Sequence, residues 1–148
     1  MFAILTLLRQ GRERVLYVDL DAHHGDGVED AFYEDPRVTT VSVHEQRRWP
    51  FSGTHSHPHA GAYNFSVPAG FNDSEFKHIM QRAVLPLGES IGTDGVVIFG
   101  EIGGTQEERI ADLIERHGMR WMRRNEFGLI DRWLKTVPEA TMRAQFLA

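Results

Sequence analysis

Three short runs of β-branched and other apolar residues recur along the chain, and they restrict its fold more than any other feature. They occupy residues 15–18, 38–43 and 95–99, and each is too short for a helix. The segment between the first two runs is expected to be a helix over 26–34, with acid in its first turn and a stop before Pro36. A strand, a helix and a second strand in this order predict a right-handed parallel crossover unit. The sequence therefore predicts an α/β domain with a mainly parallel sheet.

Helical patterns and one further strand complete the expected organisation. The apolar opening segment predicts a helix that ends near Arg9, and a short strand is expected at 63–67. A helix capped by Asp73 is predicted to run to about Leu87, because its apolar residues follow a helical period. Two further helices are expected near the C-terminus, over 105–117 and 126–136.

Composition and charge narrow the classes of function. A chain of 148 residues suits one domain with a real core. Its net charge of -5 gives no support to binding of nucleic acid or of an anionic membrane surface. The absence of cysteine excludes disulfides and thiolate metal ligands, and it agrees with a cytoplasmic protein. The oligomeric state, including a homo-oligomer, stays open.

The stretch VDLDAHHGDG, residues 18–27, follows the first predicted strand and carries the clearest chemical pattern. Alternate side chains of an extended segment share a face, so Asp19, Asp21 and His23 are expected to point the same way. They lie at the carboxyl end of a predicted parallel strand, where α/β proteins place their binding sites. A carboxylate and an imidazole two residues apart suit a borderline divalent ion such as zinc.

The end of this stretch allows two interpretations. Gly25 and Gly27 permit a tight turn, which would bring Asp26 back as a support behind the metal ligands. Alternatively, these are turn and helix-cap residues, and for Asp26 alone an N-cap is the favoured interpretation. For the whole set a metal site is favoured, because polar groups that share one face at the end of a buried strand need a partner.

The longer segment VLYVDLDAHHGDGVEDAFYEDPRVTTVSVH resembles the zinc-dependent histone deacetylase family, which includes acetylpolyamine amidohydrolases and acetoin-utilisation relatives. The resemblance extends over about residues 7–87, and its most specific part is the DLDxHHGDG motif. It implies an arginase-like, three-layer α/β fold and metal-activated hydrolysis of an acetyl amide. Acetylated lysine or an acetylpolyamine-type small molecule would be the substrate.

The resemblance also implies roles for particular residues. Asp21 and His23 would be zinc ligands, whereas Asp19 and Asp26 would orient the family's pair of catalytic histidines. Asp19 would in addition share a potassium ion with the Ser42 hydroxyl and nearby backbone carbonyls.

Two further residues have matching positions in the family. Phe51 lies where the family places an aromatic wall of the acyl-lysine tunnel, with ordinary core packing as the alternative. His44 follows the second predicted strand, and we expect it to be a structural rather than a catalytic histidine.

Several expected groups are missing from the chain. The histidine pair would precede Met1, and the glycine-rich turn with the oxyanion tyrosine is not found. The third zinc ligand should be an aspartate after residues 95–99, but Ile102 holds that position. Glu101 is one residue away, and it could act as the ligand only if the loop were rebuilt.

From about Gly92 onward the chain diverges from the deacetylases, and DGVVIFGEIGGTQEE locally resembles the alpha subunit of succinyl-CoA ligases. We therefore expect residues 1–148 to be a partial, truncated deacetylase-like domain with little activity alone. A non-catalytic relative that keeps a metal-binding or structural role is the alternative, and a CoA-ligase-like fragment is a distant one.

Two other patterns allow weaker interpretations. THSHPHA carries His55, His57 and His59 at alternate positions, and alternating imidazoles can bind a transition metal, although surface loops also carry such runs without function. The basic run at 120–124 is short and flanked by acid, which favours a solvated face or a partner contact.

Overall fold

The computed structural model describes residues 1–100, and these form one compact unit. The predicted helices at 105–117 and 126–136, the basic run at 120–124 and the position of Glu101 lie outside the described residues.

A parallel sheet forms the centre of the unit. Its strands have the order β3-β2-β1-β4, and every neighbouring pair is parallel. The strand bounds are β1 Val15–Asp19, β2 Val38–Glu45, β3 Ala62–Val67 and β4 Gly95–Phe99. The expectation that 15–19, 38–43 and 95–99 are neighbouring parallel strands is confirmed.

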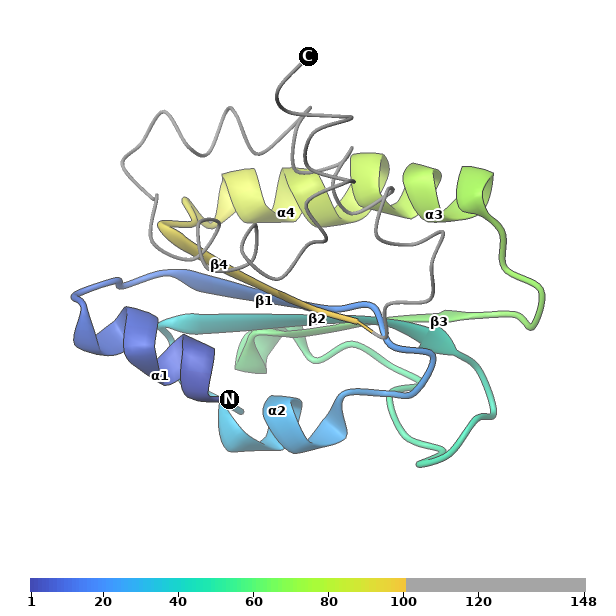
Figure 1. The fold of residues 1–148 in the computed structure, drawn as a ribbon, viewed down its shortest axis with the longest axis horizontal. Helices are drawn as coiled ribbons and strands as arrows, with labels where there is room; N and C mark the ends of the chain where they lie inside the picture. The colour runs from blue at the N-terminus through green and yellow to red at the C-terminus, as the bar shows by residue number, and fades with distance from the viewer. Residues whose placement is uncertain (101–148) are drawn as a thin grey trace, which may run out of the picture. The chain divides into compact units, whose positions relative to one another are not determined.

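Helices cover both faces of the sheet (Figure 1). The pair α1 and α2 lies on one face, and α3 with α4 lies on the other, which gives three layers. Their bounds are α1 Phe2–Arg9, α2 Asp26–Ala31, α3 Asp73–Ile79 and α4 Leu85–Ser90, with a π-helical stretch at Met80–Val84 and a 3-10 turn at Pro58–Ala60. Within residues 1–100, no helix has the length and apolar character needed to cross a membrane.

The helix between β1 and β2 is shorter than expected. It ends at Ala31 rather than at residue 34, and Glu34 takes a left-handed conformation with φ 65°. The Glu34 N–H donates to the Ala60 carbonyl at 3.3 Å instead of to the preceding turn, so a contact distant in sequence fixes the chain just after the helix.

The cap of α3 also differs from expectation. The helix begins with a capping box in which Asn72, not Asp73, is the N-cap, because the Asn72 side chain accepts from the Ser74 and Glu75 N–H groups. The predicted helix from residue 73 to Leu87 is present as two α-helices, α3 and α4, which the π-helical stretch joins. Pro86 follows that stretch, and since proline has no N–H it cannot bond back to the preceding turn.

The core determines where the site lies. All residues of β1 are buried, and Ile4 and Leu7 of α1 are buried as well. Because β1 has a neighbouring strand on each side and helices on both faces, its last residue, Asp19, is a buried acid at the carboxyl edge of the sheet.

Candidate metal centre

Asp19 is only 3% exposed, and its carboxylate is held from two sides. The Tyr17 hydroxyl donates to Oδ2 at 2.8 Å, and the Asp21 backbone N–H donates to Oδ1 at 3.0 Å. Burial raises the pKa of Asp19 above its usual value, although both hydrogen bonds oppose this rise. A buried carboxylate in this position gains from a nearby cation.

Asp21 and His23 converge, as the sequence predicted. His23 Nδ1 lies 3.0 Å from Asp21 Oδ1, and the His23 backbone N–H donates to the same oxygen at 3.0 Å. Their side chains are 19% and 40% exposed, so an ion can reach them from solvent. Two ligands of a tetrahedral zinc ion with bonds of about 2.0–2.1 Å lie about 3.3 Å apart, so this pair fits the ion with little movement. We call Asp21 and His23 the ligand pair.

The ligand pair alone does not complete a zinc site. Among residues 1–100, no group of three or more His, Cys, Asp or Glu side chains could hold a metal ion. Catalytic zinc usually has three protein ligands, and the candidate third ligand, Glu101, lies outside the described residues. Zinc binding therefore stays a prediction.

Ser42 lies beside Asp19 across the sheet, because the two are register partners on β2 and β1. The Ser42 hydroxyl is buried and accepts from the Gly25 N–H at 3.4 Å. A Cβ added to Gly25 would overlap the Asp19 carboxylate, so the backbone packs directly against that acid. This oxygen-rich, buried corner suits a hard cation, and the potassium assignment to Asp19 and Ser42 stays a prediction.

The turn that follows the ligand pair contradicts one of the two interpretations of its sequence. Asp26 is the first residue of α2, and its Oδ1 accepts from the Gly27 N–H at 2.7 Å. Gly25 is the N-cap, so the N-cap alternative for Asp26 is wrong. Gly25 has φ -78°, which any residue can adopt, so its close approach to Asp19 is what requires glycine. The role of Asp26 towards a histidine pair stays a prediction.

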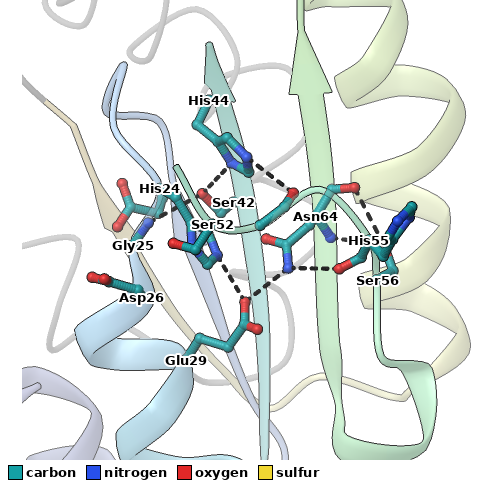
Figure 2. Close-up of polar contacts among 12 residues, drawn as sticks. His24, Gly25, Asp26, Glu29, Ser42, His44, Ser52, His55, Ser56 and Asn64 are labelled. Carbon is teal, nitrogen blue, oxygen red and sulfur yellow. Dashed lines mark hydrogen bonds and ion pairs between the residues drawn. The ribbon is translucent and has the colours of Figure 1, made fainter. Parts of the chain in front are cut away.

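A second set of polar side chains begins at His24, the residue after the ligand pair (Figure 2). His24 is central to it, with Nδ1 2.8 Å from Ser52 Oγ and Nε2 3.0 Å from Glu29 Oε2. Asn64 Nδ2 donates to the same Glu29 oxygen at 2.9 Å. The set comprises His24, Glu29, Ser42, His44, Ser52 and Asn64, and we call it the polar cluster.

His24 and Glu29 form an ion pair. Burial lowers the pKa of His24, but the Glu29 hydrogen bond and charge outweigh burial and leave this pKa above its usual value. Burial raises the pKa of Glu29, but hydrogen bonds from His24 and Asn64 outweigh it and leave this pKa below its usual value. When it is protonated, the His24 ring donates from both nitrogens, to Ser52 and to Glu29.

His44 is a structural histidine, as expected. Burial and the charge of His24 lower the pKa of His44, so its ring is neutral. Nε2 donates to the Gly53 carbonyl at 3.1 Å, and Nδ1 accepts from the Ser42 hydroxyl at 2.9 Å. With its side chain only 2% exposed, both ring nitrogens are satisfied inside the fold.

Comparison with known proteins places these residues in a family. The model of the histone deacetylase domain matches residues 1–126, which extends beyond the 7–87 range of the sequence resemblance on both sides. The chain belongs to the histone deacetylase family. The match includes residues 94–108, the segment of β4 and its continuation that locally resembles succinyl-CoA ligases.

Individual relatives agree with this assignment. The chain is 44% identical over 71 residues to the acetoin utilization protein AcuC of Bacillus subtilis (strain 168), covering 45% of this chain and 18% of that protein. The structure of the histone deacetylase Clr3 aligns with TM-score 0.54 and 33% identity, over 64% of this chain and 18% of Clr3. The HDA15 HD domain has TM-score 0.61 at 22% identity, over 75% of this chain and 38% of that domain, and supports the fold.

Phe51 of this deacetylase-family chain is not a core residue. Its side chain is 71% exposed, so the core-packing alternative is wrong. Trp49 nearby is 68% exposed, and its ring centroid lies 6.3 Å from that of His23 in an edge-on arrangement. The role of Phe51 as a tunnel wall stays a prediction.

The second histidine motif is brought together only in part. The rings of His57 and His59 lie 6.0 Å apart, and the Tyr33 ring lies edge-on to both, at 6.1 Å and 6.4 Å. The ring of His55 makes no ring contact with this group in the described part of the chain. A transition-metal role for these imidazoles stays a prediction.

Sequence reasoning missed four residues of the site. Tyr17 could have been found, because strand alternation places it on the face of Asp19. Glu29 was taken only as helix-start acid, although its spacing of five from His24 is compatible with contact across the turn. Ser52 and Asn64 come from distant segments, and no local pattern indicates their contacts.

Proposed function

We propose that this chain contributes the metal-binding part of a zinc-dependent amidohydrolase that removes acetyl groups from acetylated lysine or from acetylpolyamine-type amides. The observation that carries the proposal is the convergence of Asp21 and His23 at the carboxyl edge of the sheet, within a deacetylase-family domain. The chain spans 18% of the acetoin utilization protein, so the activity proposed is that of a whole domain.

The residues present fit zinc as two of its ligands. Zinc, when bound, polarises the acetyl carbonyl and lowers the pKa of a coordinated water. Asp21 and His23 would hold the ion through Oδ1 and Nδ1, the two atoms that already face each other. Asp19 fixes the start of this loop by accepting the Asp21 N–H, and so sets where the Asp21 carboxylate lies.

Zinc titration of the purified chain tests the ligand pair. We expect weak binding, since only two ligands come from the described residues, and we expect Asp21→Ala and His23→Ala to abolish it. The parent chain and all variants in this titration should carry His57→Ala and His59→Ala, because these two neighbouring imidazoles could bind zinc independently. Asp30→Ala, an exposed acid on α2, is the matched control. Equal zinc stoichiometry in Asp21→Ala and the control would overturn the assignment.

Turnover by the isolated chain should be low. The sequence supplies neither the histidine base nor the oxyanion tyrosine, and loss of a general base alone lowers a rate by roughly 10²- to 10⁴-fold. A fluorogenic acetyl-lysine peptide with added zinc measures this. Turnover at an ordinary enzyme rate that Asp21→Ala abolishes would show that the chain supplies these groups in another way. Zinc binding without turnover, even with added partner chains, would favour a non-catalytic relative.

A further inference from the structure

One large aromatic side chain lies beside the ligand pair, and a second is exposed two residues further along the chain. Trp49 and Phe51 are 68% and 71% exposed, and both lie on the loop that follows β2. The Trp49 ring lies edge-on to His23, with 6.3 Å between centroids. We call residues 49–51 the aromatic segment.

The backbone of this loop is held in a conformation that needs support. Phe51 has φ 66°, in the left-handed region that side chains other than glycine rarely adopt, and Gly53 has φ 72°. A residue other than glycine stays in this region only where its surroundings fix it. The Phe51 N–H donates to the Arg48 carbonyl at 2.8 Å, but a turn of this length does not by itself anchor the loop to the fold.

The two residues immediately after Phe51 anchor the loop, and each of them contacts a histidine of the polar cluster. Ser52 Oγ lies 2.8 Å from His24 Nδ1, and the Gly53 carbonyl accepts from His44 Nε2 at 3.1 Å. A Cβ added to Gly53 would lie 2.6 Å from His24 Cδ2 and 2.7 Å from His44 Cε1. The loop backbone therefore rests directly on both imidazole rings.

These rings are themselves fixed to the scaffold (Figure 2). Glu29 of α2 holds His24 from the other side at 3.0 Å, and Ser42 of β2 holds His44 at 2.9 Å. The ring centroids of His24 and His44 are 4.8 Å apart, so the two support each other. A continuous chain of contacts thus runs from a helix and a strand to the residue after Phe51.

We infer that His24 and His44 are positioning residues that hold the aromatic segment beside the ligand pair through Ser52 and Gly53. This inference rests on the proposed function in one respect, because it gives the aromatic segment an acyl substrate to contact. His24 follows the ligand His23 directly, so one turn of chain sets both the metal ligand and the support of the apolar wall. The arrangement sets the distance between the ligand pair and the aromatic segment.

Trp49 allows this arrangement to be measured. In a background of Trp121→Phe and Trp133→Phe, Trp49 is the one remaining tryptophan. Fluorescence anisotropy of Trp49 in the metal-free chain reports whether the loop is held. Added Co²⁺, an open-shell ion with a ligand preference similar to that of zinc, should quench Trp49 at short range when bound at the ligand pair.

Ser52→Ala is the decisive variant, because it removes the hydroxyl that His24 contacts and leaves both histidines in place. We expect a loss of Trp49 anisotropy and a loss of Co²⁺ quench amplitude, with the apparent Kd for Co²⁺ unchanged. Ser52→Thr keeps the hydroxyl and should restore both signals. Ser56→Ala is the matched control, since the Ser56 hydroxyl bonds the Asn64 backbone and not His24. Far-UV circular dichroism verifies that each variant is folded.

The outcomes separate this inference from the proposed function. Anisotropy that is the same in Ser52→Ala and Ser56→Ala overturns the positioning role, whatever the metal does. A loss of anisotropy in Ser52→Ala alone supports the positioning role even if Co²⁺ does not bind. Absence of Co²⁺ binding to the parent chain counts against the metal centre only.

Discussion

His23 and His24 are neighbours in the chain, but their imidazoles lie in different surroundings. The His23 side chain is 40% exposed and faces Asp21, with 3.0 Å between His23 Nδ1 and Asp21 Oδ1. The His24 side chain is 4% exposed and is enclosed between Ser52 and Glu29. The first belongs to the ligand pair and the second to the polar cluster.

The difference shows that neighbouring residues of one short motif can have separate roles, one in the proposed metal binding and one in stabilising the loop. β1 ends at Asp19 and residues 21–23 form bends, so the two imidazoles separate within a turn: that of His23 stays partly exposed and that of His24 is enclosed by the fold. Because the side chains of the ligand pair are partly exposed, an ion can replace the contact between His23 and Asp21. The enclosed histidine has two fixed partners, and it stabilises the loop that the ligand occupies. Stability and metal binding should therefore respond to different substitutions.

The largest effect on stability is expected in the polar cluster. Glu29→Ala removes the acceptor shared by His24 and Asn64 and leaves a charged imidazole enclosed without its partner. We expect the free energy of unfolding to fall by about 2–3 kcal/mol, measured by urea denaturation. Asp30→Ala on the same helix is exposed and should change it by less than about 0.5 kcal/mol. Equal effects of the two variants would show that Glu29 contributes no more to stability than an exposed acid of the same helix.

The same pair should show a defined pH dependence. The lowered pKa of Glu29 means that its contribution is complete above the ordinary value of 4.5 and is lost as the pH falls through the lower folded value. The raised pKa of His24 means that its contribution is complete below 6.5 and is lost as the pH rises through the higher folded value.

The difference in unfolding free energy between the parent chain and Glu29→Gln should therefore be largest between pH 4.5 and 6.5. Asp26 and His44 also face His24, but both remain in the two proteins, so their effects largely cancel in the difference. A difference that grows steadily towards alkaline pH would contradict the ion pair.

Two glycines of the motif provide the next comparison. Gly25→Ala places a methyl group against the buried Asp19 carboxylate, and we expect a loss of about 1–3 kcal/mol from overpacking. Gly27 lies in α2 with nothing within 4 Å of an added Cβ, so Gly27→Ala should be neutral or stabilising by up to about 1 kcal/mol. Thermal unfolding of the two variants side by side measures this, and a destabilised Gly27→Ala would show that both glycines serve the turn.

A smaller effect is expected at Tyr17. Tyr17→Phe removes the hydroxyl that donates to Asp19 Oδ2 and leaves the Asp21 N–H as the donor to that carboxylate. Burial raises the pKa of Tyr17, so its phenol is a protonated donor throughout the accessible pH range. We expect a loss of about 1–2 kcal/mol, with a further rise in the pKa of Asp19 that NMR titration can detect. An unchanged Asp19 pKa would mean that the hydroxyl contributes little.

The sequence was sufficient for those parts that depend on local patterns. Alternation in an extended continuation of the first strand predicted that Asp21 and His23 would meet, and they do, although β1 itself ends at Asp19. The short apolar runs predicted that β1, β2 and β4 are neighbouring parallel strands. The contacts of Ser52 and Asn64 were not predictable, because they depend on how distant loops return to the sheet edge. The close approach of the Gly25 backbone to Asp19 was not predictable either, because it depends on the tertiary position of that carboxylate.

The smallest effect on stability, and the sharpest test of the comparison, is expected at His23. His23→Ala removes a half-exposed side chain whose main partner is Asp21, so the metal-free chain should lose less than about 0.5 kcal/mol. Added zinc should stabilise the parent chain by mass action, by about 2.7 kcal/mol at a concentration 100 times the Kd, and we expect this gain to vanish in His23→Ala. Glu29→Ala, although much less stable, should keep the gain, because it leaves both members of the ligand pair in place. Thermal shifts with and without zinc measure all three chains. If Glu29→Ala also lost the zinc gain, the polar cluster would be needed to form the ligand pair, and the two histidines would act as one unit.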